Sequence, residues 1–191
     1  MKKIIILISA AVFFFTAVFA EEKIIFTEIS VNYSSVFDPA GISDDITGVY
    51  DGPDFYANAG CDIYGWASVY AGVGFCFYID MQDSNFNYTF TPVYIGARAN
   101  IFPENSFYPD IFFEYGRAFA NRHTVIYGPL LSEDPVDTPW TADYYSFGIG
   151  VNYRLTDIAV VSVKVHRPAF SGSLSGEIHT VKAGASVKIY Y

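Results

Sequence analysis

The sequence predicts an all-β fold: an eight-stranded antiparallel up-and-down barrel that crosses a membrane. The chain has 191 residues, of which 52% are hydrophobic and 19% aromatic but only 16% charged. This composition excludes a disordered polymer, and the length suits one domain. The apolar residues alternate with a period of two, which is typical of strands with one apolar face. The opposite face is rich in glycine, tyrosine and charge.

Residues 1–20 have the three parts of a secretory signal peptide. Lys2 and Lys3 give a basic start, 4–19 are almost all apolar, and Val18 and Ala20 provide the small side chains of a cleavage site. The alternative is an uncleaved membrane anchor, although the tract is short for a span of about 20 residues. We therefore expect an exported barrel made of residues 21–191.

Eight segments alternate clearly enough to predict strands. In three of them, every odd-numbered residue is apolar or aromatic: 67–79, 145–155 and 181–191. Five more follow the pattern less tightly: 25–33, 55–63, 93–101, 111–119 and 159–165. Because side chains of a strand point to alternate faces, each segment presents one continuous apolar face.

The predicted connections are alternately short and long. Short turns are expected near Gly65, at 103–109 and at 156–157, and long connections at 34–54, 81–87, 122–142 and 171–176. The first and third long connections are acidic, with Asp38, Asp44, Asp45, Asp51, Asp54, Glu133, Asp134 and Asp137. They are interpreted either as a solvated rim or as a surface that binds a basic partner or, through cations, a surface glycolipid.

Aromatic residues gather at the strand ends, where membrane barrels carry interfacial girdles. On the long-connection side these are Tyr33, Phe37, Tyr88, Trp140, Tyr144 and Phe170, and on the short-turn side Tyr64, Trp66, Phe102, Phe107, Tyr108 and Tyr191.

The side chains opposite the apolar face indicate which face of the strands lines the interior of the barrel. They include eight glycines: Gly60, Gly72, Gly74, Gly96, Gly116, Gly148, Gly150 and Gly184. Glycines and tyrosines together suit a narrow interior better than a solvated exterior. The apolar face suits lipid. The alternative is a soluble barrel or sandwich whose apolar face is the core.

The inward face also carries charges that we expect to form a network: Glu28, Asp62, Arg98, Glu114, Arg154, Lys164, Lys182 and Lys188. A fold about Ser106 sets Arg98 opposite Glu114, and barrel closure brings Glu28 near Lys188. Buried charges need partners. The network is interpreted as a structural plug or, alternatively, as a gate for ions or a small solute.

Other kinds of site have no support in the sequence. A net charge of −9 argues against nucleic-acid binding. Cys61 and Cys76 fall on opposite faces and out of register, so no disulfide is expected. No spaced Cys/His set for zinc and no calcium loop is present. We therefore expect no cofactor and no metal.

The chain resembles the small eight-stranded outer-membrane β-barrel proteins of diderm bacteria. The resemblance is carried by the alternation, by residues 91–98, by Tyr108-Pro109, by 113–116 and by the terminal aromatic Tyr191. It implies insertion in outer-membrane lipid as a monomer, with both termini in the periplasm. It also implies that Val187, Ile189 and Tyr191 belong to a last-strand signal read by the barrel-assembly machinery. The family ends more often in Phe than in Tyr.

Some outer-membrane barrels are lipid A deacylases with a His-x-Ser motif, and none of the three histidines here is in such a motif. The hypothesis is a non-enzymatic structural or surface-interaction protein with a filled interior, which binds any extracellular ligand through its long acidic loops. The alternative is a narrow conduit for ions or for small or hydrophobic solutes.

Overall fold

The computed structural model describes residues 25–36, 50–63, 65–80, 86–124, 136–172 and 176–191. The expected signal peptide and most of the expected long connections therefore lie outside the described residues.

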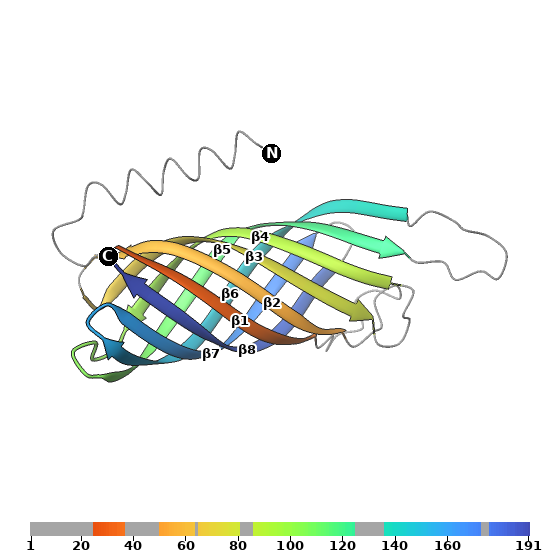
Figure 1. Cartoon of the computed structure of the whole chain (residues 1–191). Helices are drawn as coiled ribbons and strands as arrows, with labels where there is room; N and C mark the ends of the chain where they lie inside the picture. The colour runs from red at the N-terminus through yellow and green to blue at the C-terminus, as the bar shows by residue number, and fades with distance from the viewer. Residues whose placement is uncertain (1–24, 37–49, 64, 81–85, 125–135, 173–175) are drawn as a thin grey trace.

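Eight antiparallel strands, each paired with its neighbours in the chain, close into a barrel when β1 pairs with β8 (Figure 1). The strands are β1 (Ile25–Val36), β2 (Tyr50–Asp62), β3 (Ala67–Asp80), β4 (Phe86–Asn100), β5 (Phe107–Thr124), β6 (Val136–Thr156), β7 (Ala159–Gly172) and β8 (Gly176–Tyr190). The predicted all-antiparallel barrel is confirmed. Closure leaves no edge strand around the wall.

The alternation decides which side chains face outward. Odd-numbered apolar residues line the exterior, where Ile29 is 66% and Ile95 69% exposed. Even-numbered polar and aromatic residues point inward, and Glu28, Arg98 and Lys188 are almost completely buried. The barrel thus has an apolar outside and a polar inside, the reverse of a soluble barrel.

We call the end of the barrel with the connections β2–β3, β4–β5 and β6–β7 the turn end, and the opposite end the loop end. β1 begins and β8 ends at the turn end (Figure 1). In the β4–β5 turn, Phe102 adopts a positive φ of 55°, which is uncommon for a bulky residue. Among the described residues, no helix is long and apolar enough to cross a membrane.

The strands extend further toward the loop end than the alternation predicted. β6 begins at Val136 rather than at 145, and β4 at Phe86 rather than at 93. As a result Asp51 and Asp54 belong to β2 and Asp137 to β6, not to the long connections. The other five acidic loop residues lie outside the described residues.

About half of the expected aromatic girdle points into the barrel instead. Tyr33, Trp66, Phe102, Phe107 and Tyr191 are exposed on the exterior. Trp140 is half-buried against the interior cluster, and four others are buried inside: Tyr88, Tyr108, Tyr144 and Phe170. All five inward residues have even numbers and lie within strands, where the period-two rule decides their direction. Trp66 and Phe102 also have even numbers but lie in turns, where the rule does not apply. Phe37 and Tyr64 lie outside the described residues.

Candidate functional site: the filled barrel interior

The interior holds two groups of buried charges at different heights. The first, which we call the Glu28 cluster, lies toward the turn end and contains Glu28, Arg98, Asp110, Lys164 and Lys188. The second, the Lys182 cluster, lies toward the loop end and contains Asp54 and Lys182 with Ser34, Tyr56 and Cys76.

Glu28 receives hydrogen bonds from four other strands. Arg98 Nη2 of β4 lies 2.7 Å from Oε2, and Lys164 Nζ of β7 donates to Oε1. Ser186 Oγ of β8 donates to Oε1 at 2.7 Å, and Asn58 Nδ2 of β2 to Oε2 at 3.4 Å. One carboxylate on β1 therefore connects five strands across the interior.

Arg98 is shared between Glu28 and a second carboxylate, Asp110. Its Nε lies 3.5 Å from Asp110 Oδ2, which also accepts a hydrogen bond from Asn152 at 3.0 Å. The guanidinium lies 5.2 Å from the centre of the Tyr70 ring, a distance at which cation–π attraction operates. These contacts compensate a charge that would be costly to bury alone.

Lys188 extends the Glu28 cluster to the turn end. It lies opposite Glu28 in the β1–β8 register, and its ammonium lies 4.6 Å from the centre of the Phe26 ring. The Tyr190 hydroxyl donates to Asp62 at 3.0 Å, and Asp62 also accepts from Ser68 at 2.6 Å. Asp62 is only half-buried and lies where the polar interior ends, at the turn end of the barrel.

The Lys182 cluster contains a single ion pair, surrounded by neutral groups. Lys182 Nζ lies 2.5 Å from Asp54 Oδ2, and Ser34 Oγ donates to the same carboxylate oxygen. The ammonium also contacts the Tyr56 hydroxyl, lies 3.3 Å from Cys76 Sγ and lies over the Tyr56 ring at 5.0 Å. Cys61 and Cys76 are both free.

Glu114 is not the partner of Arg98, contrary to the sequence-based expectation. Arg98 pairs with Phe112 in the β4–β5 register, and Glu114 pairs with Gly96, because the turn centres near residue 105 rather than 106. The Glu114 carboxylate instead accepts hydrogen bonds from Tyr70 at 3.1 Å and from Tyr144 at 2.7 Å.

Arg154 does not belong to the interior either. It is exposed at the turn end, and its Nη2 donates to the carbonyl oxygen of Pro103 at 2.5 Å. The β6–β7 ladder shifts register between Arg154 and Thr156, which ends the regular alternation there. Arg154 therefore joins two neighbouring turns rather than filling the interior.

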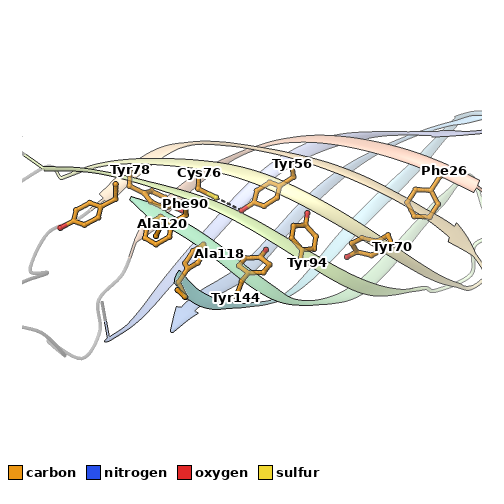
Figure 2. Close-up of a cluster of buried hydrophobic side chains, with 13 residues drawn as sticks. Phe26, Tyr56, Tyr70, Cys76, Tyr78, Phe90, Tyr94, Ala118, Ala120 and Tyr144 are labelled. Atoms are coloured by element: carbon orange, nitrogen blue, oxygen red, sulfur yellow. Dashed lines mark hydrogen bonds between the residues drawn. The ribbon is translucent and has the colours of Figure 1, made fainter. Parts of the chain in front are cut away.

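A cluster of buried aromatic side chains fills much of the space between the strands (Figure 2). Toward the loop end, the Phe90 and Phe170 rings lie 4.6 Å apart, and Phe170 also packs against Tyr144. The glycines provide the space for such rings. A Cβ on Gly96 would lie 2.4 Å from the Tyr70 ring, and one on Gly72 would lie 2.6 Å from the Tyr94 ring. A cavity of about 20 Å³ lies among these side chains, lined in part by Tyr56, Tyr94 and Phe112.

Two interior acids, Asp54 and Asp110, were missed as candidates. Each lies one residue before a predicted strand. Asp54 falls in the acidic connection 34–54, and Asp110 falls between the predicted turn 103–109 and the predicted strand 111–119. Both have even numbers. If the period-two pattern is extended by one residue at the start of each of these strands, it places both aspartates inside the barrel.

The last strand carries the expected assembly residues on the exterior wall. Val187 is 47% and Tyr191 61% exposed, while Ile189 is half-buried. Tyr191 N donates to the carbonyl oxygen of Ile25 at 3.0 Å, and its hydroxyl lies 3.0 Å from Thr27 Oγ1. The C-terminal residue is thus joined to the first strand.

A serine–histidine pair is present, but it lies inside the filled interior. Ser146 Oγ is 2.9 Å from His166 Nδ1, and both residues are buried. The adjoining cavity of about 20 Å³ has room for about one water molecule and none for a substrate. Within the described ranges, no group of three or more His, Cys, Asp or Glu side chains could hold a metal ion.

No protein-family model matches the chain, and no curated protein matches it. Solved structures do match. Neisserial surface protein A (NspA) is 11% identical, with 87% of this chain and 97% of that chain covered and a TM-score of 0.67. Ail, the attachment invasion locus protein of Yersinia pestis, is 12% identical, with 86% and 98% covered and a TM-score of 0.50.

A major outer membrane protein from Thermus thermophilus is 10% identical, with 85% of this chain and 99% of that chain covered and a TM-score of 0.51. At such identities the likeness is one of fold. The chain is similar to small eight-stranded barrels of bacterial outer membranes.

Proposed function

We propose that this protein is an outer-membrane barrel with a filled interior that has a structural or surface-interaction role and no enzymatic activity. The observation that carries the proposal is the contrast between the two faces of one closed wall. The exterior exposes apolar side chains on all eight strands, while the interior contains ion pairs, aromatic rings and a cavity of about 20 Å³. Lipid outside and a solid core inside satisfy both faces.

The fold similarity supports a bacterial outer membrane as the location, with outer-membrane lipid around the barrel. In this arrangement both termini face the periplasm, and the barrel-assembly machinery reads the last strand through Val187, Ile189 and Tyr191. The barrel acts as a monomer, because closure leaves no edge strand around the wall for a second copy.

Surface interaction would take place at the loop end. One solved structure of Ail is a complex with sucrose octasulfate, a heparin analogue and therefore a polyanion. The connections of the present chain carry acidic residues instead, including Asp38, Asp44, Asp45, Glu133 and Asp134. Charge complementarity therefore favours a basic partner.

The experiment combines conductance with binding. The refolded barrel is inserted into planar bilayers and then tested for capture by immobilised polylysine and by immobilised heparin. We expect no steady conductance, and capture by polylysine that falls with salt and is lost when 37–49 and 125–135 are replaced by short turns. A large steady conductance that survives loop trimming would overturn the filled interior and favour the conduit. Capture by heparin rather than polylysine would overturn the assigned partner chemistry.

A further inference from the structure

The central cavity of the barrel lies between the two charge clusters. Its volume is about 20 Å³. Its polar walls come from both sides: Ser30, Asn32, Tyr56, Glu114, Lys164 and His166. Lys164 belongs to the Glu28 cluster and Tyr56 to the Lys182 cluster, so the cavity is the place where the two clusters meet.

Two polar side chains on β1 line this cavity and have no hydrogen-bond partner among the described residues. Ser30 and Asn32 are 6% and 5% exposed, and neither makes a side-chain hydrogen bond to any part of the chain that the structure describes. Polar side chains that line an interior cavity and have no protein partner are usually satisfied by an ordered water in native proteins. Asn32 lies close to β8 because Gly184 on that strand has no side chain. A Cβ at Gly184 would lie 2.1 Å from Asn32 Oδ1.

The other walls retain unused hydrogen-bonding capacity. The Glu114 carboxylate accepts one hydrogen bond on each oxygen and can accept more. Lys164 donates to Glu28 and has further N–H groups. His166 uses Nδ1 toward Ser146, which leaves Nε2. Donors and acceptors are therefore both present around the cavity.

From this geometry we propose that the cavity is a binding site for one water molecule, held by Ser30 and Asn32 together with Glu114, Lys164 or His166. The volume supports one water, since about 10–15 Å³ is needed to hold it and a larger solute would not fit. The water lies between the Glu28 cluster, which contributes Lys164 to the cavity wall, and the Lys182 cluster, which contributes Tyr56. The inference rests on the filled interior proposed above and adds an ordered water at this cavity.

Water-to-protein cross-relaxation NMR on the refolded chain in detergent micelles tests this. The side-chain amide of Asn32 is the reporter at the site. Asn152 is the matched reporter away from it, because its amide donates to Asp110 and to the Tyr108 carbonyl within the Glu28 cluster. We expect a cross-peak at Asn32 with the sign of a water that tumbles with the protein, and none at Asn152.

A pair of Ser→Thr variants provides the second measurement. Ser30→Thr adds a methyl group to the cavity wall and is expected to abolish the Asn32 cross-peak. Ser162→Thr, a substitution elsewhere in the interior, is expected to retain it. Absence of the cross-peak from the unmodified chain, or its persistence in Ser30→Thr, would overturn the water site while the filled interior stands. Cross-peaks of rapidly exchanging water at both Asn32 and Asn152 would show an open water column and overturn the filled interior as well.

Discussion

The two charge clusters inside the barrel compensate buried ions in different ways. In the Glu28 cluster, carboxylates and cations from separate strands share partners, so that Glu28 contacts both Arg98 and Lys164, and Arg98 also contacts Asp110. In the Lys182 cluster, one cation contacts one carboxylate, and hydroxyl, thiol and aromatic groups surround the pair. Charge in the first cluster is distributed over several groups, whereas in the second it is confined to a pair. The clusters should therefore respond differently to substitution.

The largest effect is expected when Glu28 loses its charge. Glu28→Gln leaves Arg98 and Lys164 without their shared carboxylate, and we expect the free energy of unfolding to fall by about 3–5 kcal/mol. Urea unfolding of the barrel in lipid vesicles measures this. Glu114→Gln is the matched control, since Glu114 is also buried and, among the residues that the structure describes, receives its side-chain hydrogen bonds from two tyrosine hydroxyls. Its expected cost is about 1–3 kcal/mol. Equal losses would show that the cations do not depend on Glu28.

We expect that the Lys182–Asp54 ion pair can be replaced by two apolar side chains together, but not by one alone. Lys182→Met alone leaves Asp54 buried and unpaired and should cost about 3–5 kcal/mol, as should Asp54→Leu alone. The double variant removes both charges, and we expect its stability to return to within about 1 kcal/mol of the unmodified chain. A double-mutant cycle by urea unfolding gives the coupling. Additive losses would contradict the ion pair.

The exterior sharpens the comparison, because we expect an apolar wall in lipid to tolerate no isolated charge. Ile149 is 56% and Val73 45% exposed on the apolar surface. Replacement of either by Arg should cost about 2–4 kcal/mol in a bilayer. The interior control is Ser146→Thr, which retains the hydroxyl. Unchanged stability in both Arg variants would mean that the wall does not face lipid.

The smallest effect is expected at Arg154, which the sequence had placed in the interior. Because the side chain is exposed and donates a hydrogen bond to a turn carbonyl, Arg154→Gln should change stability by less than about 1 kcal/mol. Arg98→Gln, under the same conditions, should resemble Glu28→Gln. A large loss for Arg154→Gln would return this residue to the interior network.

These cases also show what the sequence could and could not predict. The period of two determines the face of each residue, so the inward direction of Glu28, Arg98 and Lys182 was predicted from parity alone. Pairing across strands depends on where a turn is centred, and parity does not contain that information. A shift of one residue in the centre of the β4–β5 turn moved Arg98 two residues away from Glu114. Arg98 contacts both Glu28 and Asp110 because the whole barrel closes. The pattern of a single hairpin does not predict such a contact.

The long sequence separations within the Glu28 cluster have a kinetic consequence. Glu28 contacts Lys164 and Ser186 across 136 and 158 residues, so these contacts require the first and last strands to have met. Loop closure must be overcome before contacts between such distant parts of the chain can form, so we expect them to form late in folding. Loss of late contacts mainly accelerates unfolding. The cluster should therefore determine how long the closed barrel persists once formed, while the rate at which hairpins assemble depends little on it.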